Sequence, residues 1–238
     1  MRETTHERTR DLITLIAWAV ALVLLHMLTN GRYGFHRDEL SSLADGCSLA
    51  WGYVGGPPLT PFLARAAFTL FGPSPVGLRA FGALAMGIAL VLTGLMAREM
   101  GGSRHVQVVA ALCAAIGGVA LSAGTMLEYV SLDYLWWVTA AYCVVRVLAS
   151  GDARWCLGIG AALGIGTMTK YDIAFFAAGI GAGFVFTPAR RHMRSPWSWA
   201  GVALALAIFL PNLIWLFLHG FVTLAGDHPR ARRRHRPH

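Results

Sequence analysis

The 238-residue sequence has few charged residues, four cysteines and a single lysine. Charged residues make up 13% of the chain, well below the share of about 25% in ordinary soluble domains. The cysteines show no CxxC spacing and there is no His/Cys metal motif, which excludes a zinc ribbon and a disulfide-stapled mini-protein. No Walker motif and no GxGxxG fingerprint occurs, which argues against a soluble nucleotide as substrate.

Long apolar runs dominate the sequence, in which 56% of the residues are hydrophobic. A transmembrane helix needs about 20 mostly apolar residues, and five runs approach that length. Two shorter runs follow one another as either two short spans or one re-entrant pair. The long runs are residues 12–29, 76–97, 106–127, 133–149 and 197–218, and the short ones are residues 155–169 and 173–187. We therefore predict an all-α polytopic membrane protein with about seven transmembrane helices.

The basic residues indicate how these helices cross the membrane, because cytoplasmic loops carry an excess of Lys and Arg. With residues 1–11 in the cytoplasm, the inner segments hold ten basic residues and the outer segments hold five, leaving the C-terminal tail aside. The first apolar run is too long for a signal-peptide core. We predict a multi-pass protein of the plasma membrane with a cytoplasmic N-terminus, and no nucleic-acid partner.

The C-terminal tail breaks this charge pattern. Half of the net charge of +8 follows Gly226, on the side of the membrane where the rule disfavours it. We interpret residues 12–224 as the transmembrane module. Residues 225–238 then form a basic tail that is either disordered or not native-like in sequence.

The one long loop, residues 30–75, lies on the predicted outer face. Apolar residues at helical spacing predict two short amphipathic helices on the membrane surface. The sequence Gly55-Gly56-Pro57-Pro58 predicts the turn between them, and Thr60-Pro61 is typical of a helix start.

Carboxylates on the outer face are candidates for catalysis. Asp38 and Glu39 follow the first span, where a partly dehydrated carboxylate can act as a general base. The alternative is a solvated helix N-terminus, which favours acids through the helix dipole. Asp133 opens the fourth long run and is either a functional acid at membrane depth or a helix cap, and Glu128 has the same ambiguity.

Lys170 is the only lysine, and it lies between the two short apolar runs. A compact ammonium suits a phosphate oxygen, with Tyr171 as a further donor and Asp172 holding the ammonium in place. The alternative is an interfacial lysine paired with Asp172. His219 ends the last span on the same face. Acids and one lysine on a single face indicate a site for an anionic, lipid-tethered substrate.

Eight segments share a pattern with a known family. They are residues 33–40 (YGFHRDEL), 50–53 (AWGY), 57–61 (PPLTP), 71–74 (FGPS), 95–102 (LMAREMGG), 169–171 (TKY), 187–191 (TPARR) and 211–215 (PNLIW). Over about residues 12–224 the chain resembles the dolichyl-phosphate-mannose–protein mannosyltransferase-like (PMT-like) GT-C membrane glycosyltransferases. Members usually have eleven or more spans, so the chain resembles their core module, truncated at the C-terminus.

The resemblance implies inverting transfer of a mannose-like sugar from a polyprenyl phosphate to an acceptor hydroxyl at the outer face. The acceptor would be a protein, a glycan or a lipid. By position, the resemblance implies Asp38 as general base, Glu39 as its support and Asp133 as a second acid. It implies substrate-binding roles for Lys170, near the lipid phosphate, and for Tyr171, Arg37 and His219. It requires no cofactor, although a divalent metal is compatible with it. The alternatives are a transporter of a lipid-linked or small substrate and an inactive truncated remnant.

Overall fold

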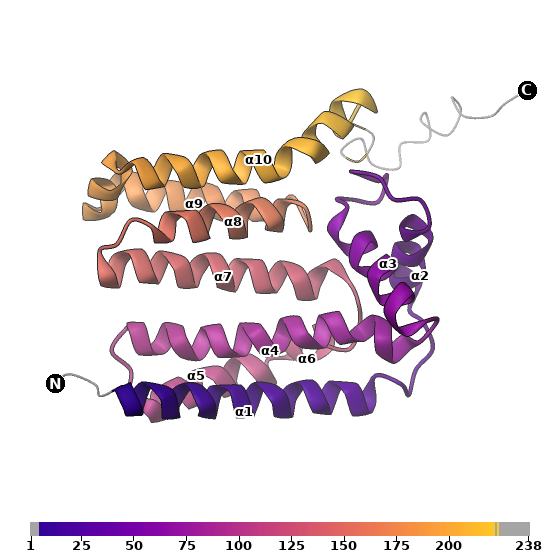
Figure 1. The fold of residues 1–238 in the computed structure, drawn as a ribbon, viewed down its shortest axis with the longest axis horizontal. Helices are drawn as coiled ribbons and strands as arrows, with labels where there is room; N and C mark the ends of the chain where they lie inside the picture. Colours follow the sequence, from indigo (N-terminus) through magenta and orange to yellow (C-terminus); the bar gives the residue numbers. More distant parts are fainter. Residues whose placement is uncertain (1–4, 222, 224–238) are drawn as a thin grey trace, which may run out of the picture.

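The computed structural model describes residues 5–221 and residue 223, so residues 1–4 and the whole basic tail predicted at 225–238 lie outside the described residues. Helices are the only regular secondary structure in the described part (Figure 1). They are α1 (Thr5–Thr29), α2 (Arg37–Gly46), α3 (Leu59–Phe71), α4 (Pro75–Glu99), α5 (Arg104–Ile116), α6 (Gly118–Ala123), α7 (Tyr129–Ser150), α8 (Trp155–Thr167), α9 (Ile173–Phe186), the 3₁₀ helix η1 (Pro188–Arg194) and α10 (Pro196–Leu218).

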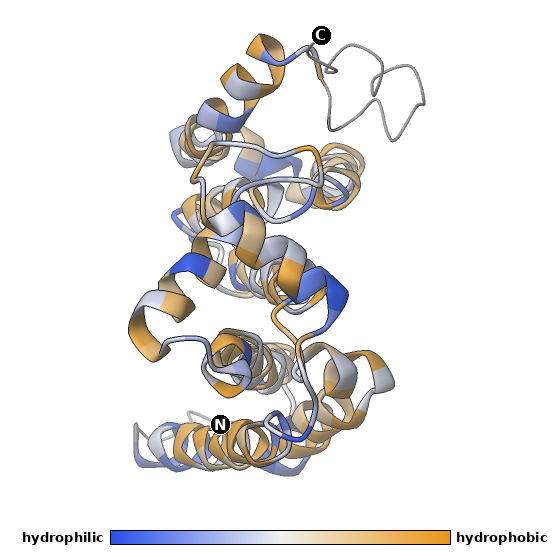
Figure 2. Cartoon of the chain, turned by 90° about the vertical axis from the view of Figure 1, so that its right-hand side faces the viewer, coloured by the Kyte–Doolittle hydropathy of each residue, from blue (hydrophilic) through white to orange (hydrophobic). Residues whose placement is uncertain are grey.

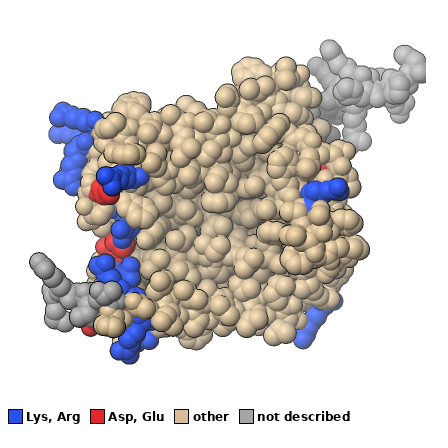
Figure 3. Space-filling model, in the orientation of Figure 1, with Lys and Arg blue, Asp and Glu red and all other residues tan. Residues whose placement is uncertain are grey.

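Five helices lie side by side in the order α1, α4, α7, α8 and α10 (Figure 1). α5 and α6 pack against α4, and α9 packs against α7 and α8. Charged side chains gather at two opposite ends of the face seen in Figure 3, with a wide uncharged band between them. This distribution is that of a bundle whose middle lies in hydrocarbon, because isolated charges are costly there.

The number of helices that can cross a membrane is smaller than predicted. α1, α4, α7 and α10 are long and apolar enough, and a fifth candidate is the pair α9 and η1, which is bent by 103°. The run 106–127 breaks at Gly117, whose backbone leaves the helix between α5 and α6, because adjacent glycines have low helix propensity. α8 has 13 residues and is therefore about 20 Å long, short of the roughly 30 Å hydrocarbon core. The described residues thus support four or five spans, and seven are not confirmed.

The end of the bundle that carries α2 and α3 corresponds to the outer face in the predicted topology. Seen from this end, the short helices cross over the ends of the long ones (Figure 2). Two short helices do occur within residues 30–75, and their place in a membrane interface stays a prediction. α3 begins at Leu59, with Thr60 and Pro61 in its first turn.

Side-chain caps explain where several helices begin. His36 caps α2: its Nδ1 accepts from the Asp38 backbone N–H, while the Glu39 carboxylate accepts from the His36 N–H. Ser74 caps α4 and Ser195 caps α10, and each is followed by proline at the first helical position.

α8 and α10 approach each other at backbone distance. A Cβ atom on Gly160 would overlap the carbonyl oxygen of Gly201, and a Cβ on Gly201 would overlap that of Cys156. Small residues at membrane helix interfaces permit this kind of contact. The glycines therefore fix the position of α10, which closes the apolar cavity described below.

We expect Gly201→Leu to separate α8 from α10 and to lower the free energy of unfolding by about 3 kcal/mol or more, because the added side chain has no space. Gly179→Leu in α9 is the matched control, since a Cβ there meets no atom within 4 Å. Melting temperatures of the two variants in detergent are the measurement. Equal melting of both would contradict this packing.

Candidate functional site

A buried ion pair between Glu39 and Arg79 lies at the end of the bundle that carries α2 and α3. The Glu39 side chain is 0% exposed and the Arg79 side chain 3%, and two N–H···O contacts of 2.8 Å join their guanidinium and carboxylate groups. The remaining guanidinium N–H groups donate to the backbone carbonyls of Asn30, Tyr33 and Gly34. All five donors of the arginine are therefore used. Arg79 holds the chain that leaves α1 against α4.

The Glu39 carboxylate also accepts from two backbone N–H groups, those of His36 at 2.8 Å and Leu127 at 3.2 Å. Burial alone would raise the pKa of Glu39, but the hydrogen bonds from Arg79 and these two backbone groups lower it below its usual value. Glu39 is therefore an ionised connector of α2, α4 and the approach to α7. It presents no surface to a substrate, so any support that it gives to Asp38 is positional.

We expect Glu39→Gln to lower the free energy of unfolding by about 3–5 kcal/mol, because it leaves Arg79 buried without a counter-ion. The contribution of Glu39 is present at neutral pH and is lost as the pH falls through its lowered pKa. Melting temperatures of E39Q, R79Q and the double variant would measure the coupling. A double variant whose loss equals the sum of the two single losses would show that the groups are independent.

Consecutive residues of a helix point about 100° apart, so Asp38 does not share the buried direction of Glu39. Its side chain is 40% exposed and lies 3.4 Å from Arg37 Nε and 3.7 Å from His36 Nδ1. Asp38 is thus accessible at the outer end of the molecule. Arg37 is almost fully exposed, and its guanidinium contacts Asp38.

Lys170 lies in the short connection between α8 and α9. Its Nζ is 2.9 Å from Asp172 Oδ2 and 4.7 Å from the centre of the Tyr129 ring. The hydrogen bond to Asp172 raises the pKa of Lys170; burial opposes this shift, and the nearby charges of Asp172 and Asp133 support it. Lys170 is therefore a fixed cation, held by Asp172.

Glu128 lies within electrostatic range of both Asp38 and Lys170. Burial raises the pKa of Glu128, the negative charge of Asp38 raises it further, and His36 and Lys170 act in the opposite direction. Asp133 lies in the first turns of α7, where its carboxylate accepts from Trp137 Nε1 at 3.2 Å. We call Asp38, Glu128, Asp133, Lys170 and Asp172 the outer charged cluster.

Tyr171 and His219 make their contacts elsewhere. The Tyr171 hydroxyl donates to Asn212 Oδ1 at 2.9 Å, and Asn212 Nδ2 donates to the Trp51 carbonyl at 2.6 Å. This chain ties the loop before α3 to α10. His219 stacks on Trp215 of its own helix with ring centres 4.1 Å apart. Sequence reasoning did not single out Asn212, although a polar residue after proline in an apolar run signals a partner.

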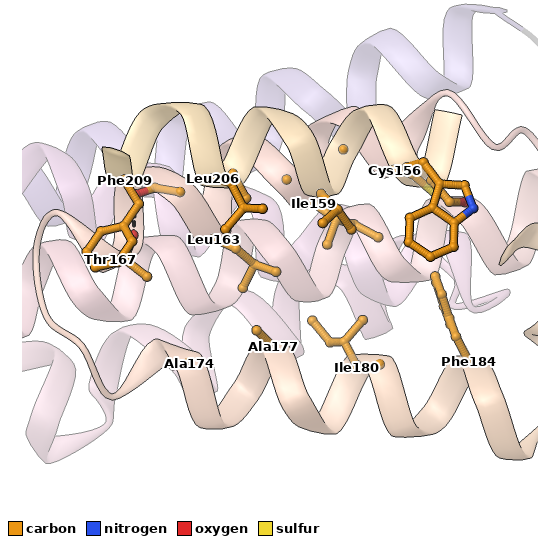
Figure 4. Close-up of a pocket in the computed structure, with 18 of the residues that line it drawn as sticks. Cys156, Ile159, Leu163, Thr167, Ala174, Ala177, Ile180, Phe184, Leu206 and Phe209 are labelled. Atoms are coloured by element: carbon orange, nitrogen blue, oxygen red, sulfur yellow. Dashed lines mark hydrogen bonds between the residues drawn. The ribbon is translucent and has the colours of Figure 1, made fainter. Parts of the chain in front are cut away.

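An apolar cavity of about 360 Å³ lies between α8, α9 and α10 (Figure 4). Thr167, Ala174 and Phe209 are at one end and Cys156 and Phe184 at the other. The first end adjoins the connection that carries Lys170, because Thr167 ends α8 and Phe209 contacts the Tyr171 ring. One end of the cavity therefore lies close to the connection that carries Lys170.

Among the described residues, no group of three or more His, Cys, Asp and Glu side chains could hold a metal ion.

These features define a multi-pass membrane protein with a charged site at one end. The family model for dolichyl-phosphate-mannose-protein mannosyltransferase matches residues 55–215, which is more than half of the chain. The chain therefore belongs to this family of membrane glycosyltransferases. The matched stretch includes Asp133 and Lys170 and begins after Asp38 and Glu39. No curated protein and no solved structure matches the chain.

Proposed function

We propose that this protein is a GT-C glycosyltransferase that moves a mannose-like sugar from a polyprenyl phosphate to an acceptor hydroxyl at the outer membrane face. The observation that carries the proposal is the place of Lys170, in the connection next to one end of the apolar cavity and within electrostatic range of Glu128 and Asp133. Membership of a mannosyltransferase family supports both the reaction class and the sugar.

The donor side combines a cation with an apolar cavity, which matches a phosphate on a hydrocarbon chain. Asp172 takes one of the three N–H donors of Lys170, so the others remain for a phosphate oxygen. The cavity is lined almost entirely by aliphatic and aromatic side chains such as Leu163, Ile180 and Leu206. Each methylene buried there would contribute about 0.8 kcal/mol to donor binding.

The transfer step needs a base and charge stabilisation. Asp38 takes the proton of the acceptor hydroxyl, and the oxygen attacks the anomeric carbon on the face opposite the phosphate. A new C–O bond forms as the bond to the phosphate breaks, which inverts the anomeric configuration. The leaving phosphate is already a stable anion, so Lys170 stabilises its charge and no strong acid is required.

The other residues in the proposal have supporting roles. Glu39 positions Asp38 from below, and Asp133 lies on the donor side as a second acid, near Lys170. Arg37 binds substrate beside Asp38. Tyr171 and His219 would contact substrate directly only by exchanging their present hydrogen bonds.

We expect Asp38→Asn to lower transfer of radiolabelled mannose from a polyprenyl-phosphate donor at least about 100-fold, because general-base catalysis contributes roughly 10²–10⁴. The assay uses membranes containing equal amounts of each variant. Asp45→Asn, in the same helix α2, is the control and should retain activity. Wild-type transfer by D38N would remove Asp38 from the mechanism.

We expect Ala177→Phe, which places a ring in the apolar cavity, to raise KM for a long-chain donor about tenfold, since it displaces two or more buried methylenes. The same variant should use a donor with one isoprene unit as wild type does. KM values for both donors provide the measurement. An unchanged KM for the long-chain donor would show that the hydrocarbon lies elsewhere.

A further inference from the structure

Lys and Arg side chains gather at the end of the bundle opposite α2 and α3, where η1 joins α9 to α10 (Figure 1, Figure 3). At this end, three arginines contact Glu99 or Asp11; they are Arg98, Arg104 and Arg146. Three exposed arginines of η1 form no ion pair within the described part of the chain; they are Arg190, Arg191 and Arg194. Their charges are therefore available to an external anion.

The threefold repeat of the 3₁₀ helix sets the place of these arginines, since side chains three residues apart lie above one another. Ala189 and His192 form the buried face of η1. Arg191 and Arg194 form a second face, and the third carries Met193, which lines the apolar cavity between α8, α9 and α10. Arg191 Nε donates to His192 Nε2 at 3.3 Å, which orients its guanidinium. A face with two arginines thus lies next to the cavity wall.

Hydrogen bonds fix η1 against the start of α10. The Trp199 indole N–H donates to the Met193 carbonyl at 3.1 Å, and the Ser198 hydroxyl donates to the His192 carbonyl at 2.7 Å. Ser198 Oγ is also 3.4 Å from Cys156 Sγ, at the end of the cavity where α8 begins. Trp199 lines the cavity and is 64% exposed. The cavity wall therefore reaches the outside of the protein beside η1.

We propose that this place binds an anionic phospholipid, with its headgroup on Arg191 and Arg194 and one acyl chain in the cavity beside Trp199. A soluble anion or an acidic protein would use the arginines alone, whereas a lipid uses the arginines and the apolar wall together. The exposed indoles of Trp197 and Trp199 are typical of the headgroup level of a membrane. The proposed donor phosphate binds at the other end of the cavity, so this lipid is a second ligand and goes beyond the proposed function.

The test is native mass spectrometry of the full chain, titrated in detergent with dioleoylphosphatidylglycerol. The first comparison is dioleoylphosphatidylcholine, which has the same chains and no net charge. The second is glycerol 3-phosphate, which carries an anion without chains. We expect phosphatidylglycerol to bind at least about tenfold more tightly than either. Equal binding of phosphatidylcholine would overturn the headgroup site, and equal binding of glycerol 3-phosphate would show that the ligand is a soluble anion.

The double variant Arg191→Gln with Arg194→Gln tests the headgroup site. It should weaken phosphatidylglycerol binding at least about tenfold and leave phosphatidylcholine binding unchanged, because each cation near an anionic headgroup strengthens binding roughly fivefold. Both side chains are exposed, so the melting temperature should stay that of wild type. The control removes the same charge at the other end of the bundle, from the exposed Arg32 and Arg65. Unchanged binding in R191Q/R194Q, or an equal loss in R32Q/R65Q, contradicts the site.

Gly181→Phe tests the place of the acyl chain. Gly181 lines the cavity, and a Cβ there meets no atom within 4 Å, so the helix accepts the larger residue. We expect both phospholipids to bind about tenfold more weakly, because the ring takes the space of two or more methylenes. Gly179→Phe, outside the cavity walls on the same helix, is the control. Wild-type binding of both lipids by G181F would remove the chain from the cavity.

Discussion

The outer face of this protein depends on one buried ion pair, Glu39 with Arg79. Taking two charges out of water is unfavourable unless their geometry is good and their other hydrogen-bonding groups are matched. Here every guanidinium N–H has an acceptor, and the carboxylate accepts two backbone N–H groups besides. The pair therefore joins α1, α2, α4 and the approach to α7, which are the elements that carry or surround Asp38.

This constraint gives two adjacent acids different roles. Glu39 is fixed inward as an ionised connector, whereas the side chain of Asp38 is 40% exposed. One end of the apolar cavity lies next to the connection that carries Lys170. The proposed reaction uses both features, with a lipid phosphate bound by Lys170 and with Asp38 as the base for a hydroxyl.

The sequence predicted most of the helices, long and short, but not the break inside the run 106–127. Hydropathy identified α1, α4, α7 and α10, because a long apolar helix has few alternatives in a membrane. It merged α5 with α6, since a hydropathy window does not register the break at Gly117. Topology placed Asp38, Asp133 and Lys170 at one end, and adjacency suggested the Lys170–Asp172 pair, which is confirmed. The Glu39–Arg79 pair was missed because it joins residues 40 positions apart. Its signal was nevertheless present, because an arginine inside the apolar run 76–97 needs a buried partner.

The central claim is that Glu39 is ionised and paired in the folded protein at neutral pH. The infrared difference spectrum between wild type and E39Q, recorded in the carboxyl region, measures this directly. If Glu39 is ionised, the substitution removes an ionised carboxylate band and no protonated carboxyl band. Loss of a protonated carboxyl band would show a neutral Glu39, and the ion pair could not then organise the end of the bundle that carries α2 and α3.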